Sequence, residues 1–574
     1  MKPCYAWLLV SSLALCGCAG TNLRSQSPEG IADVLEVDTK LVGSVARPFG
    51  HNYVAVEAIA LATCLDNTGE DPAPSPQRAA LLHELQTIGV QNPNQLLASP
   101  STAMILVKGQ LPPGVQKGDK FDIEVKVPSH SEASSLRGGW LMETRLTEMA
   151  VLGGAIRQGH PLAVGEGPIL VDPSADGEKD RAILLRGKVL GGGIATRSRD
   201  LGLFIGPEDK SVRLAAQVGQ AINARFHTFH RGIKQGVATP KTDERIDLKV
   251  HPRYKDNIAR YIRVVRAIPL KESPAEQALR VELLERQLLD PISAATAALR
   301  LEAIGRKSVE SLAKGVDNAD PEVRFYAAEA LAYLDDSRAA APLARAAREE
   351  PTFRAFALAA LSSMVDMSAR DALFELLEVA SSETRYGAFR AIWAMNPNDP
   401  AIRGENLGGQ FGYHVLNTSG PAMVHVTRSY RPEVVVFGHE QTLKAPFILD
   451  AGKQIMVKGV AGKVTVSRFA PGKPDQKRVV STKLDEVIRA IVELGGTYPD
   501  VVQALQHAKT SGALDARFEV DALPEEDRIY QQREAEADSK PLADAEPEPE
   551  SEQQIAAANP LPELFPGRKR KATR

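Results

Sequence analysis

Two histidines and a run of glycines are the residues of this chain whose spacing most invites a chemical role. His227 and His230 are three residues apart, so a helix would place both rings on one face, where they could bind a metal ion. No Asp, Glu or Cys grouping accompanies them, and we expect no metal site there. Gly191, Gly192 and Gly193 lack the spaced glycines of a phosphate-binding loop, so we expect a flexible turn. The sequence therefore predicts no catalytic, cofactor-binding or metal-binding residue, and we expect that the protein is not an enzyme.

The cysteines near the N-terminus carry a different chemistry. Lys2 precedes a short apolar run over 7–15, which is too short to span a membrane and is typical of an export signal. A branched residue stands three positions before Cys18 and a glycine directly before it, as in the lipobox at which lipoproteins are acylated and cleaved. We therefore expect residues 1–18 to be a signal peptide with a lipobox and Cys18 to be a lipidation candidate. An ordinary signal peptide is the alternative, and both place the mature chain outside the cytoplasm.

The composition limits the classes of protein to which the chain can belong. The chain has 574 residues, of which 43% are hydrophobic and 25% charged, as in soluble globular proteins with several domains. Its net charge of -3 provides no basic field, so we expect no nucleic-acid partner. Four cysteines in a chain of this length exclude a disulfide-stapled scaffold.

The predicted secondary structure that positions these residues changes along the chain. From 32 to 270, short strand-like runs alternate with amphipathic helices. The clearest strands are predicted at 103–108, 121–127 and 182–189, and the clearest helices at 77–88 and 211–226. Strands return over 420–466 and are followed by helices at 484–494 and 499–508. These parts predict a mixed body on either side of a helical stretch.

That stretch, from 273 to 397, is rich in alanine and leucine and repeats every thirty residues. Each unit starts at an acidic residue followed by proline, which favours the first turn of a helix. The starts are Asp290-Pro291, Asp320-Pro321 and Glu350-Pro351, with a weaker fourth at Ser381-Ser382. Small residues and then a bulky one follow each start and should face the interior: Ala297, Ala298 and Leu301; Ala327, Ala328 and Leu331; Ala357, Leu358 and Leu361; Ala388, Phe389 and Ile392.

Matching arginines lie in the last three units, at Arg324, Arg354 and Arg385. The whole pattern resembles short HEAT-like repeats, in which stacked neighbours bury each other's apolar faces. One irregular helical bundle is the alternative. We expect the array to project from the body, because the two ends of a tolerated insertion lie close together. Such an array either binds proteins or spaces two domains apart.

The C-terminal stretch 522–574 has the composition of a disordered tail. Residues 524–554 hold eleven acidic and three basic side chains, too polar to offset the entropy of ordering. Residues 568–574 carry five positive charges, which are either solvated or touch anionic lipid or wall polymer.

A succession of motifs within 32–270 carries a family resemblance. The motif residues are Thr68, Gly69 and Asp71 in one turn, Leu111-Pro112-Pro113 at a strand end, and Arg137, Gly138 and Gly139 in a later hairpin. In this order they resemble the N-terminal half of the bacterial flagellar P-ring protein family. The segment 484–516 is similar, more loosely, to that family's closing helices, so the resemblance covers about 32–270 and 420–520.

The resemblance implies a structural role. P-ring proteins form a closed homo-oligomeric ring in the periplasm, around the flagellar rod and at the level of peptidoglycan. The implied partners are therefore other copies, rod proteins and L-ring proteins, and no cofactor is implied. The lipobox at Cys18 departs from the family and would anchor the chain to the outer membrane.

The motif residues themselves indicate fold determinants. Thr68 and Gly69 suit a turn with the glycine at positive φ, and Gly138 and Gly139 suit a tight strand reversal. Arg137 either pairs with an acid across a subunit boundary or is solvated.

The sequence thus predicts an α+β chain in which a P-ring-like mixed β/α body is interrupted by an all-α HEAT-like repeat array. The predicted parts are a signal peptide (1–18), an N-terminal P-ring-like body (32–270), helical repeats (273–397), a C-terminal P-ring-like part (405–521) and a disordered charged tail (522–574). The function we expect is that of a structural subunit of the flagellar basal body P ring. Alternatives are an exported scaffold lipoprotein that binds partners through its repeats, and an enzyme acting on wall polymer, for which the sequence displays no converging acids.

Overall fold

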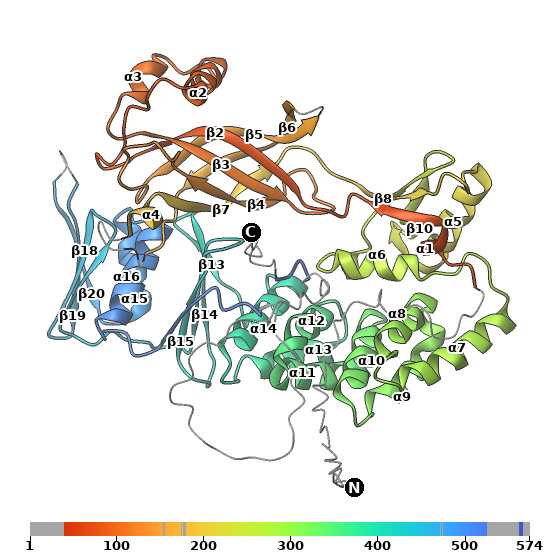
Figure 1. Ribbon diagram of the computed structural model, residues 1–574. Coiled ribbons are helices and arrows are strands. Elements are labelled where there is room, and N and C mark those ends of the chain that lie inside the picture. The colour runs from red at the N-terminus through yellow and green to blue at the C-terminus, as the bar shows by residue number, and fades with distance from the viewer. Residues whose placement is uncertain are drawn as a thin grey trace, which may run out of the picture.

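The computed structural model describes residues 39–152, 155–173, 175, 180–470, 472, 474–524 and 562–565. The expected signal peptide with Cys18 and most of the expected tail lie outside these ranges. Within them helices and strands are both abundant, which confirms the α+β prediction (Figure 1). None of the helices in these ranges is both long enough and apolar enough to cross a membrane.

A closed barrel of antiparallel strands lies along the top of Figure 1, in orange. Its strands are β2 (Val54–Thr63), β3 (Ala103–Leu111), β4 (Lys120–Lys126), β5 (Trp140–Leu152), β6 (Ala155–Pro168) and β7 (Arg186–Ala195), in the order β2-β3-β4-β7-β6-β5. Alternate residues of β4, Phe121, Ile123 and Val125, are buried in the barrel. Outside it, α2 (Pro76–Thr87) and α3 (Pro93–Leu97) bury a small apolar cluster against β2 and β3.

Two predictions about the barrel are wrong. The glycine run lies inside β7 and not in a turn. A Cβ at Gly193 would stand 2.6 Å from Cζ of Phe121, so the strand needs glycine where this ring crosses it. The strand predicted at 182–189 is preceded by a short helix, α4 (Arg181–Leu184), and starts only at Arg186.

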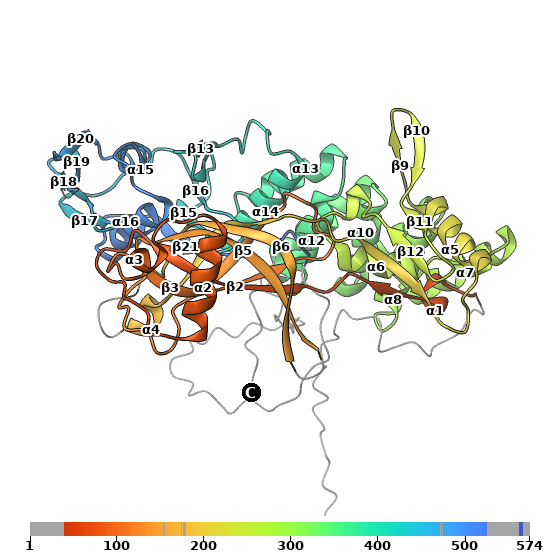
Figure 2. The same ribbon diagram turned by 90° about the horizontal axis from the view of Figure 1, so that it is seen from above.

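A smaller α/β unit follows on the right of Figure 1. Its sheet has the order β1-β8-β12-β11, from β1 (Ala46–Phe49), β8 (Leu201–Ile205), β12 (Arg245–Leu248) and β11 (Ala238–Pro240). The helices of the unit are α1 (Val42–Val45), α5 (Val212–Arg225) and α6 (Ile258–Arg266). A hairpin of β9 (His227–His230) and β10 (Ile233–Gly236) projects from the unit (Figure 2). The two histidines therefore lie on a strand, and the described part of the chain holds no cluster of His, Cys, Asp or Glu suited to a metal ion.

The helical section runs from α7 to α14. Its helices are α7 (Pro274–Leu288), α8 (Ala294–Ile304), α9 (Val309–Val316), α10 (Pro321–Tyr333), α11 (Ala340–Glu349), α12 (Pro351–Ser362), α13 (Met367–Leu376) and α14 (Ser382–Met395). All twelve side chains that we expected to face the interior are buried. Asp320 caps α10, because its Oδ1 accepts hydrogen bonds from the backbone N–H groups of Glu322 (2.8 Å) and Val323 (3.2 Å).

One expected helix start is wrong. Residues 290 and 291 form a turn in which Asp290 accepts the N–H of Ile292 at 3.1 Å, and α8 begins only at Ala294. The side chain of Asp290 is therefore used in a local turn instead of a helix cap.

The C-terminal part holds two sheets and two helices, in blue in Figure 1. One sheet has the order β13-β14-β16-β15-β21, from β13 (Glu405–Leu407), β14 (Phe411–Leu416), β16 (Glu433–Phe437), β15 (Met423–Val426) and β21 (Arg517–Val520). The other follows the chain, from β17 (Phe447–Ala451), β18 (Ile455–Val460), β19 (Lys463–Arg468) and β20 (Gln476–Ser481). Helices α15 (Leu484–Glu493) and α16 (Tyr498–Thr510) share one apolar core with both sheets.

The helical section does not project from the body, contrary to our expectation. One continuous apolar core runs from Leu203 in the α/β unit through Leu331 in the helices to Phe437 in the C-terminal sheet. The reason is that both ends of the section, α7–α8 and α14, bury their apolar faces against the flanking parts as well as against each other.

Candidate functional site

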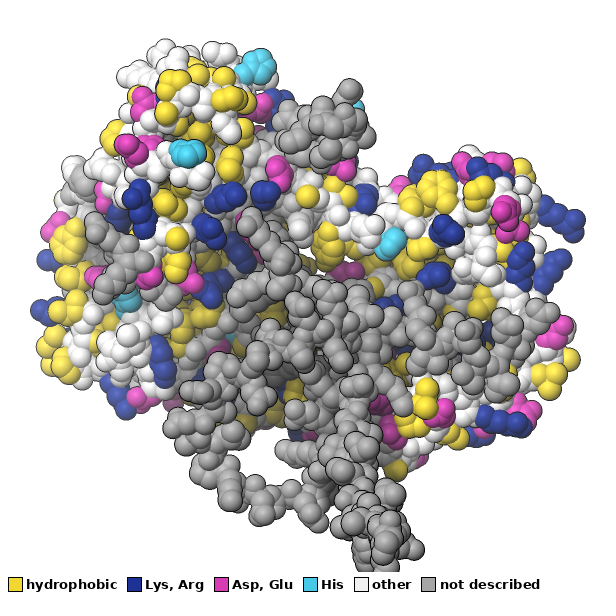
Figure 3. All heavy atoms as spheres, viewed as in Figure 1, with side chains coloured by type: hydrophobic (Ala, Val, Ile, Leu, Met, Phe, Trp, Pro, Cys, Tyr) yellow, Lys and Arg dark blue, Asp and Glu magenta, His cyan; other side chains and the backbone are white. Residues whose placement is uncertain are grey.

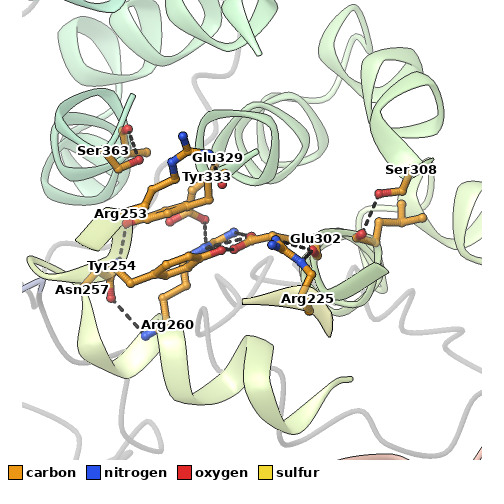
Figure 4. Close-up of polar contacts among 12 residues, drawn as sticks. Arg225, Arg253, Tyr254, Asn257, Arg260, Glu302, Ser308, Glu329, Tyr333 and Ser363 are labelled. Carbon is orange, nitrogen blue, oxygen red and sulfur yellow. Dashed lines mark hydrogen bonds and ion pairs between the residues drawn. The ribbon is translucent and has the colours of Figure 1, made fainter. Parts of the chain in front are cut away.

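A buried ionic network joins α6 to the helical section, as Figure 4 shows. Arg260 of α6 places its guanidinium between two carboxylates, with Nη2 2.5 Å from Oε2 of Glu302 and Nη1 2.5 Å from Oε2 of Glu329. The Glu302 side chain is fully buried, and that of Glu329 is 5% exposed. One guanidinium therefore bridges an acid of α8 and an acid of α10.

Two stacked tyrosines complete the network. The Tyr254 hydroxyl donates to Oε1 of Glu302 at 2.6 Å, and its ring stacks on that of Tyr333 with centroids 4.7 Å apart. Asn257 donates to the Tyr333 hydroxyl at 3.0 Å. Burial and the neighbouring Glu302 carboxylate raise the pKa of Tyr254 well above its ordinary value, so the hydroxyl stays a donor.

The charges of the network depend on one another. Burial alone would lower the pKa of Arg260, but Glu302 and Glu329 raise it instead. Burial raises the pKa of Glu329, and Arg260 opposes that rise. Removing the guanidinium would take away the cation that pairs with both buried carboxylates, so this contact fixes α6 against α8 and α10.

The matching arginines Arg324, Arg354 and Arg385 make the same kind of contact, which we did not predict from the sequence. Each donates to a backbone carbonyl at or just beyond the end of the preceding helix: Arg324 to Asn318 (2.8 Å), Arg354 to Ala347 (3.0 Å) and Arg385 to Leu377 (2.8 Å). These carbonyls have no partner within their own helix, and a cation there also interacts favourably with the helix dipole. The repeated arginine therefore ties each helix pair together.

A second polar junction joins α14 to the C-terminal sheet. Glu433 of β16 is 1% exposed and accepts hydrogen bonds from the Tyr386 hydroxyl and from Nε of Arg431. Burial alone would raise the pKa of Glu433, but Arg431 and Arg390 hold it below its ordinary value. Arg385 extends the junction by donating to Thr418 Oγ1 at 3.1 Å.

A third junction joins the barrel to the C-terminal part, two segments far apart in the sequence. Asp122 of β4 accepts the N–H of Gly191 at 2.9 Å and the N–H of Tyr430 at 2.5 Å. Arg428 forms an ion pair with Asp172, which follows β6. Burial raises the pKa of Asp122, while these two N–H donors lower it. The barrel and the C-terminal part are therefore in direct polar contact.

The predicted turn around Thr68 exists, but for a different reason. Thr68 donates to the carbonyl of Ser135 at 2.7 Å, which ties the turn to the loop before β5. Gly69 is not at positive φ; a Cβ there would stand 2.0 Å from the carbonyl oxygen of Thr102. Close approach of backbone, and not φ, requires the glycine. Asp71 forms an ion pair with Arg78 of α2.

A turn lies at Gly138, but it is not the strand reversal that we predicted, because residues 127–139 form no strand and the turn leads directly into β5. Gly138 has φ of 77°, and the N–H of Gly139 closes the turn on the carbonyl of Leu136 at 3.0 Å. Arg137 donates to the carbonyls of Asp172 (3.3 Å) and Ala175 (2.9 Å), so it braces the loop that meets Arg428. Neither of our two expectations for Arg137 describes this contact within the chain.

A cavity of about 530 Å³ opens next to the first network. Its lining comes from 251–257 and from the helical section, including Arg253, Asp256, Asn257, Asp366, Arg370 and Asp399. Arg370 is paired with Asp399 at 2.8 Å, and Arg253 with Asp335 at 3.0 Å. On the face seen in Figure 3, acidic and basic side chains are interspersed.

Sequence reasoning missed all three junctions. The available signal was the presence of Glu302 and Glu329 within otherwise apolar faces of α8 and α10, since an acid at a core position must find a cation. The partner arginine could not be identified, because Arg260 lies more than forty residues earlier, in a different part of the fold.

In a comparison with known proteins, the first part of the chain matches a protein family. Residues 45–286 match the model of the family described as flagellar P-ring protein. Among similar proteins, the flagellar P-ring protein of Anaeromyxobacter dehalogenans (strain 2CP-C) is 28% identical over 254 residues, which are 43% of this chain and 63% of the relative. That of Sodalis glossinidius is 28% identical over 276 residues (46% and 68%), and that of Thermotoga maritima is 25% identical over 219 residues (37% and 61%).

The chain thus spans about three-fifths of the length of most of these relatives. The family match contains the barrel and the β1-β8-β12-β11 sheet and ends within α7, whereas the resemblance that we noted over 420–520 lies outside it. From residue 45 to residue 286, this chain is similar to flagellar P-ring proteins.

Proposed function

We propose that this chain is a structural subunit of the P ring of the flagellar basal body. It is exported to the periplasm, and its copies form a closed ring around the rod, in contact with rod and L-ring proteins and near peptidoglycan. The observation that carries this proposal is the match of residues 45–286 to flagellar P-ring proteins, a span that holds the complete barrel and the complete β1-β8-β12-β11 sheet.

The three polar junctions support a role in which the subunit must keep its shape under mechanical force. A ring around a rotating shaft must keep its shape, and a buried ion pair penalises displacement because it would leave charges unpaired. Arg260, Glu433 and Asp122 each stand at a boundary between parts of the chain. The α/β unit contacts the helical section, the helical section contacts the C-terminal part, and the C-terminal part contacts the barrel. These contacts fix the four parts relative to one another.

The helical section and the N-terminal lipid are further parts of the proposal. We take 273–397 as HEAT-like repeats inserted between two P-ring-like parts, 32–270 and 405–521; the buried aligned residues and the recurring arginine–carbonyl bonds support this. Acylated Cys18 would anchor the ring to the outer membrane.

Deletion of the gene tests the proposal. We expect cells that do not swim and basal bodies that lack the P ring in electron micrographs, with both restored by the wild-type gene. Swimming cells with intact P rings would refute it. If swimming is normal but other envelope proteins lose their location, the exported scaffold lipoprotein is favoured instead. A Cys18→Ser gene that restores rings but leaves the protein unattached to the outer membrane would support the anchor.

A further inference from the structure

The last described residues, Pro562 to Phe565, lie in the main core although we predicted a disordered tail there. Leu564 is 4% exposed and Phe565 is fully buried, and both belong to the apolar core that includes the helical section. Figure 1 shows this short segment beside α14. Residues 525–561 separate it from the rest of the described chain. The prediction for 522–574 is thus incomplete, since an apolar island follows the acidic stretch.

The segment packs beside a glycine of one helix. A Cβ at Gly387 of α14 would stand 2.5 Å from Cδ1 of Leu358 in α12 and 3.6 Å, an ordinary contact distance, from the Phe565 ring. In the aligned repeats this position holds Tyr326 in α10 and Phe356 in α12, both buried. The helix α14 therefore lacks the aromatic side chain of the earlier repeats, and the Phe565 ring of the tail packs beside Gly387 instead.

Polar contacts fix the direction of the segment. Glu563 Oε2 accepts the N–H of Ile258, the first residue of α6, at 2.8 Å. The Leu564 carbonyl accepts a hydrogen bond from Nη2 of Arg390 at 3.3 Å, and its N–H donates to the carbonyl of Asp256 at 3.4 Å. We call the site formed by Asp256, Ile258, Leu358, Gly387 and Arg390 the tail groove; it adjoins the 530 Å³ cavity, which Asp256 also lines.

We infer that the tail groove is a peptide-binding site and that, in the assembled protein, it takes the Glu-Leu-Phe segment of a second copy of this chain. The inference rests on the proposed function, because copies must stand next to one another. When two copies exchange identical segments, every contact of the segment is preserved. The exchange therefore requires only that the residues between the segment and the rest of the chain, 525–561, reach the neighbouring copy.

The tether permits such an exchange. A fully extended chain spans at most about 3.3–3.6 Å per residue, so the 37 residues of 525–561 set an upper limit on the order of 120 Å for the distance between the two ends of the tether.

A binding experiment tests the groove in the full chain. The acceptor carries Leu564→Ala and Phe565→Ala, which empty the groove without changing its walls, and the probe is a fluorescent synthetic peptide of residues 559–568. We expect this acceptor to bind the probe at least tenfold more tightly than the wild-type chain, whose groove is occupied. The matched control peptide carries the same two alanines and should not bind. Equal binding of the two peptides would overturn the site.

A cross-linking experiment tests the second copy. A photo-reactive phenylalanine analogue replaces Phe565 in cells that assemble the protein, and the products are separated by mass. We expect irradiation to link 565 to α14 of another chain and to give products of two or more chains, which Gly387→Trp should abolish by blocking the groove. If basal bodies carry the ring and all cross-links stay within one chain, only this inference fails. If the chain is absent from the ring, the proposed function fails.

Discussion

Arg260 of α6 and the fully buried Glu302 of α8 lie 2.5 Å apart, and they connect the family-like part of the chain to its helical section. The pair belongs to a network in which a single guanidinium serves two acids. Such a contact adds little net stability compared with an apolar core, but breaking it is costly. It therefore determines how the two parts are oriented.

Arg260→Met should lower the free energy of unfolding by about 3–5 kcal/mol, because the buried Glu302 and Glu329 would lose the guanidinium that lies between them. Thermal unfolding of the full chain measures this. The matched control is Arg286→Met on α7, whose side chain is 74% exposed and pairs with Glu282; it should change stability by less than about 0.5 kcal/mol. Equal effects of the two substitutions would show that the network does not join the parts.

The arginines at the helix ends should differ in importance. Replacing Arg385 with Lys should cost about 1.5–3 kcal/mol, because a single ammonium cannot reach the Leu377 carbonyl, the Pro421 carbonyl and Thr418 together. Arg324→Lys should cost clearly less, because Arg324 is only half-buried and binds neighbouring turn carbonyls. Thermal unfolding ranks the two, and the reverse order would contradict the assigned contacts.

Gly69→Ala should destabilise the barrel more than Gly138→Ala. At Gly69 the new methyl group would collide with the Thr102 carbonyl, 2.0 Å away, so backbone must move. At Gly138 it would meet open space, and the cost is only the strain of φ at 77°, about 1 kcal/mol. Limited proteolysis and thermal unfolding compare the variants. A tolerated Gly69→Ala would mean that the turn lies farther from β3 than described.

Docking of the tail should weaken as the pH rises. Burial raises the pKa of Glu563 to about 7, against the opposing N–H of Ile258, and Asp256 adds to the rise. The docked state therefore favours the protonated acid: its stabilisation is complete below the ordinary glutamate pKa and is lost as the pH rises through about 7. The probe peptide should bind the emptied groove roughly tenfold or more weakly at pH 7 than at pH 5.

Glu563→Gln in the probe peptide is the control for that pH dependence, since glutamine keeps an acceptor for the Ile258 N–H. Asp256, Lys255 and Arg390 also face the docked segment, and burial raises the pKa of Asp256. The glutamine peptide should therefore show a much flatter pH profile, and Asp256→Asn in the acceptor should remove what remains. If neither the Glu563→Gln peptide nor the Asp256→Asn acceptor changed the pH profile of binding, the pH dependence would come from other groups.

Local signals in the sequence predicted local structure well. The Asp320-Pro321 pair predicts the start of α10 because the cap uses only neighbouring residues. The spacing of small and bulky residues predicts which faces of α8, α10, α12 and α14 are buried. Gly69 was identified as important but for the wrong reason, since its requirement comes from Thr102, which lies in another segment. We predicted disorder for residues 522–574 from their average composition. That average is dominated by acidic residues, so it does not show the two apolar side chains of Leu564 and Phe565.

The network around Arg260 could not be predicted, because its members come from α6, α8 and α10 and meet only after folding. The same holds for the contact of Asp122 with Tyr430, which are 308 residues apart. The insert was expected to project because its sequence resembles an independent array; nothing in that pattern shows that α14 would share its core with Phe437.

The hairpin turn at Arg231 and Gly232 gives the most direct test that this chain builds the ring. Both residues have positive φ, and the hairpin projects from the body, so a small folded tag inserted between them should leave the core intact (Figure 2). Averaged electron tomograms of basal bodies from swimming cells that make only the tagged protein should show extra density repeated around the P ring. An unaltered P ring in such cells would contradict the account.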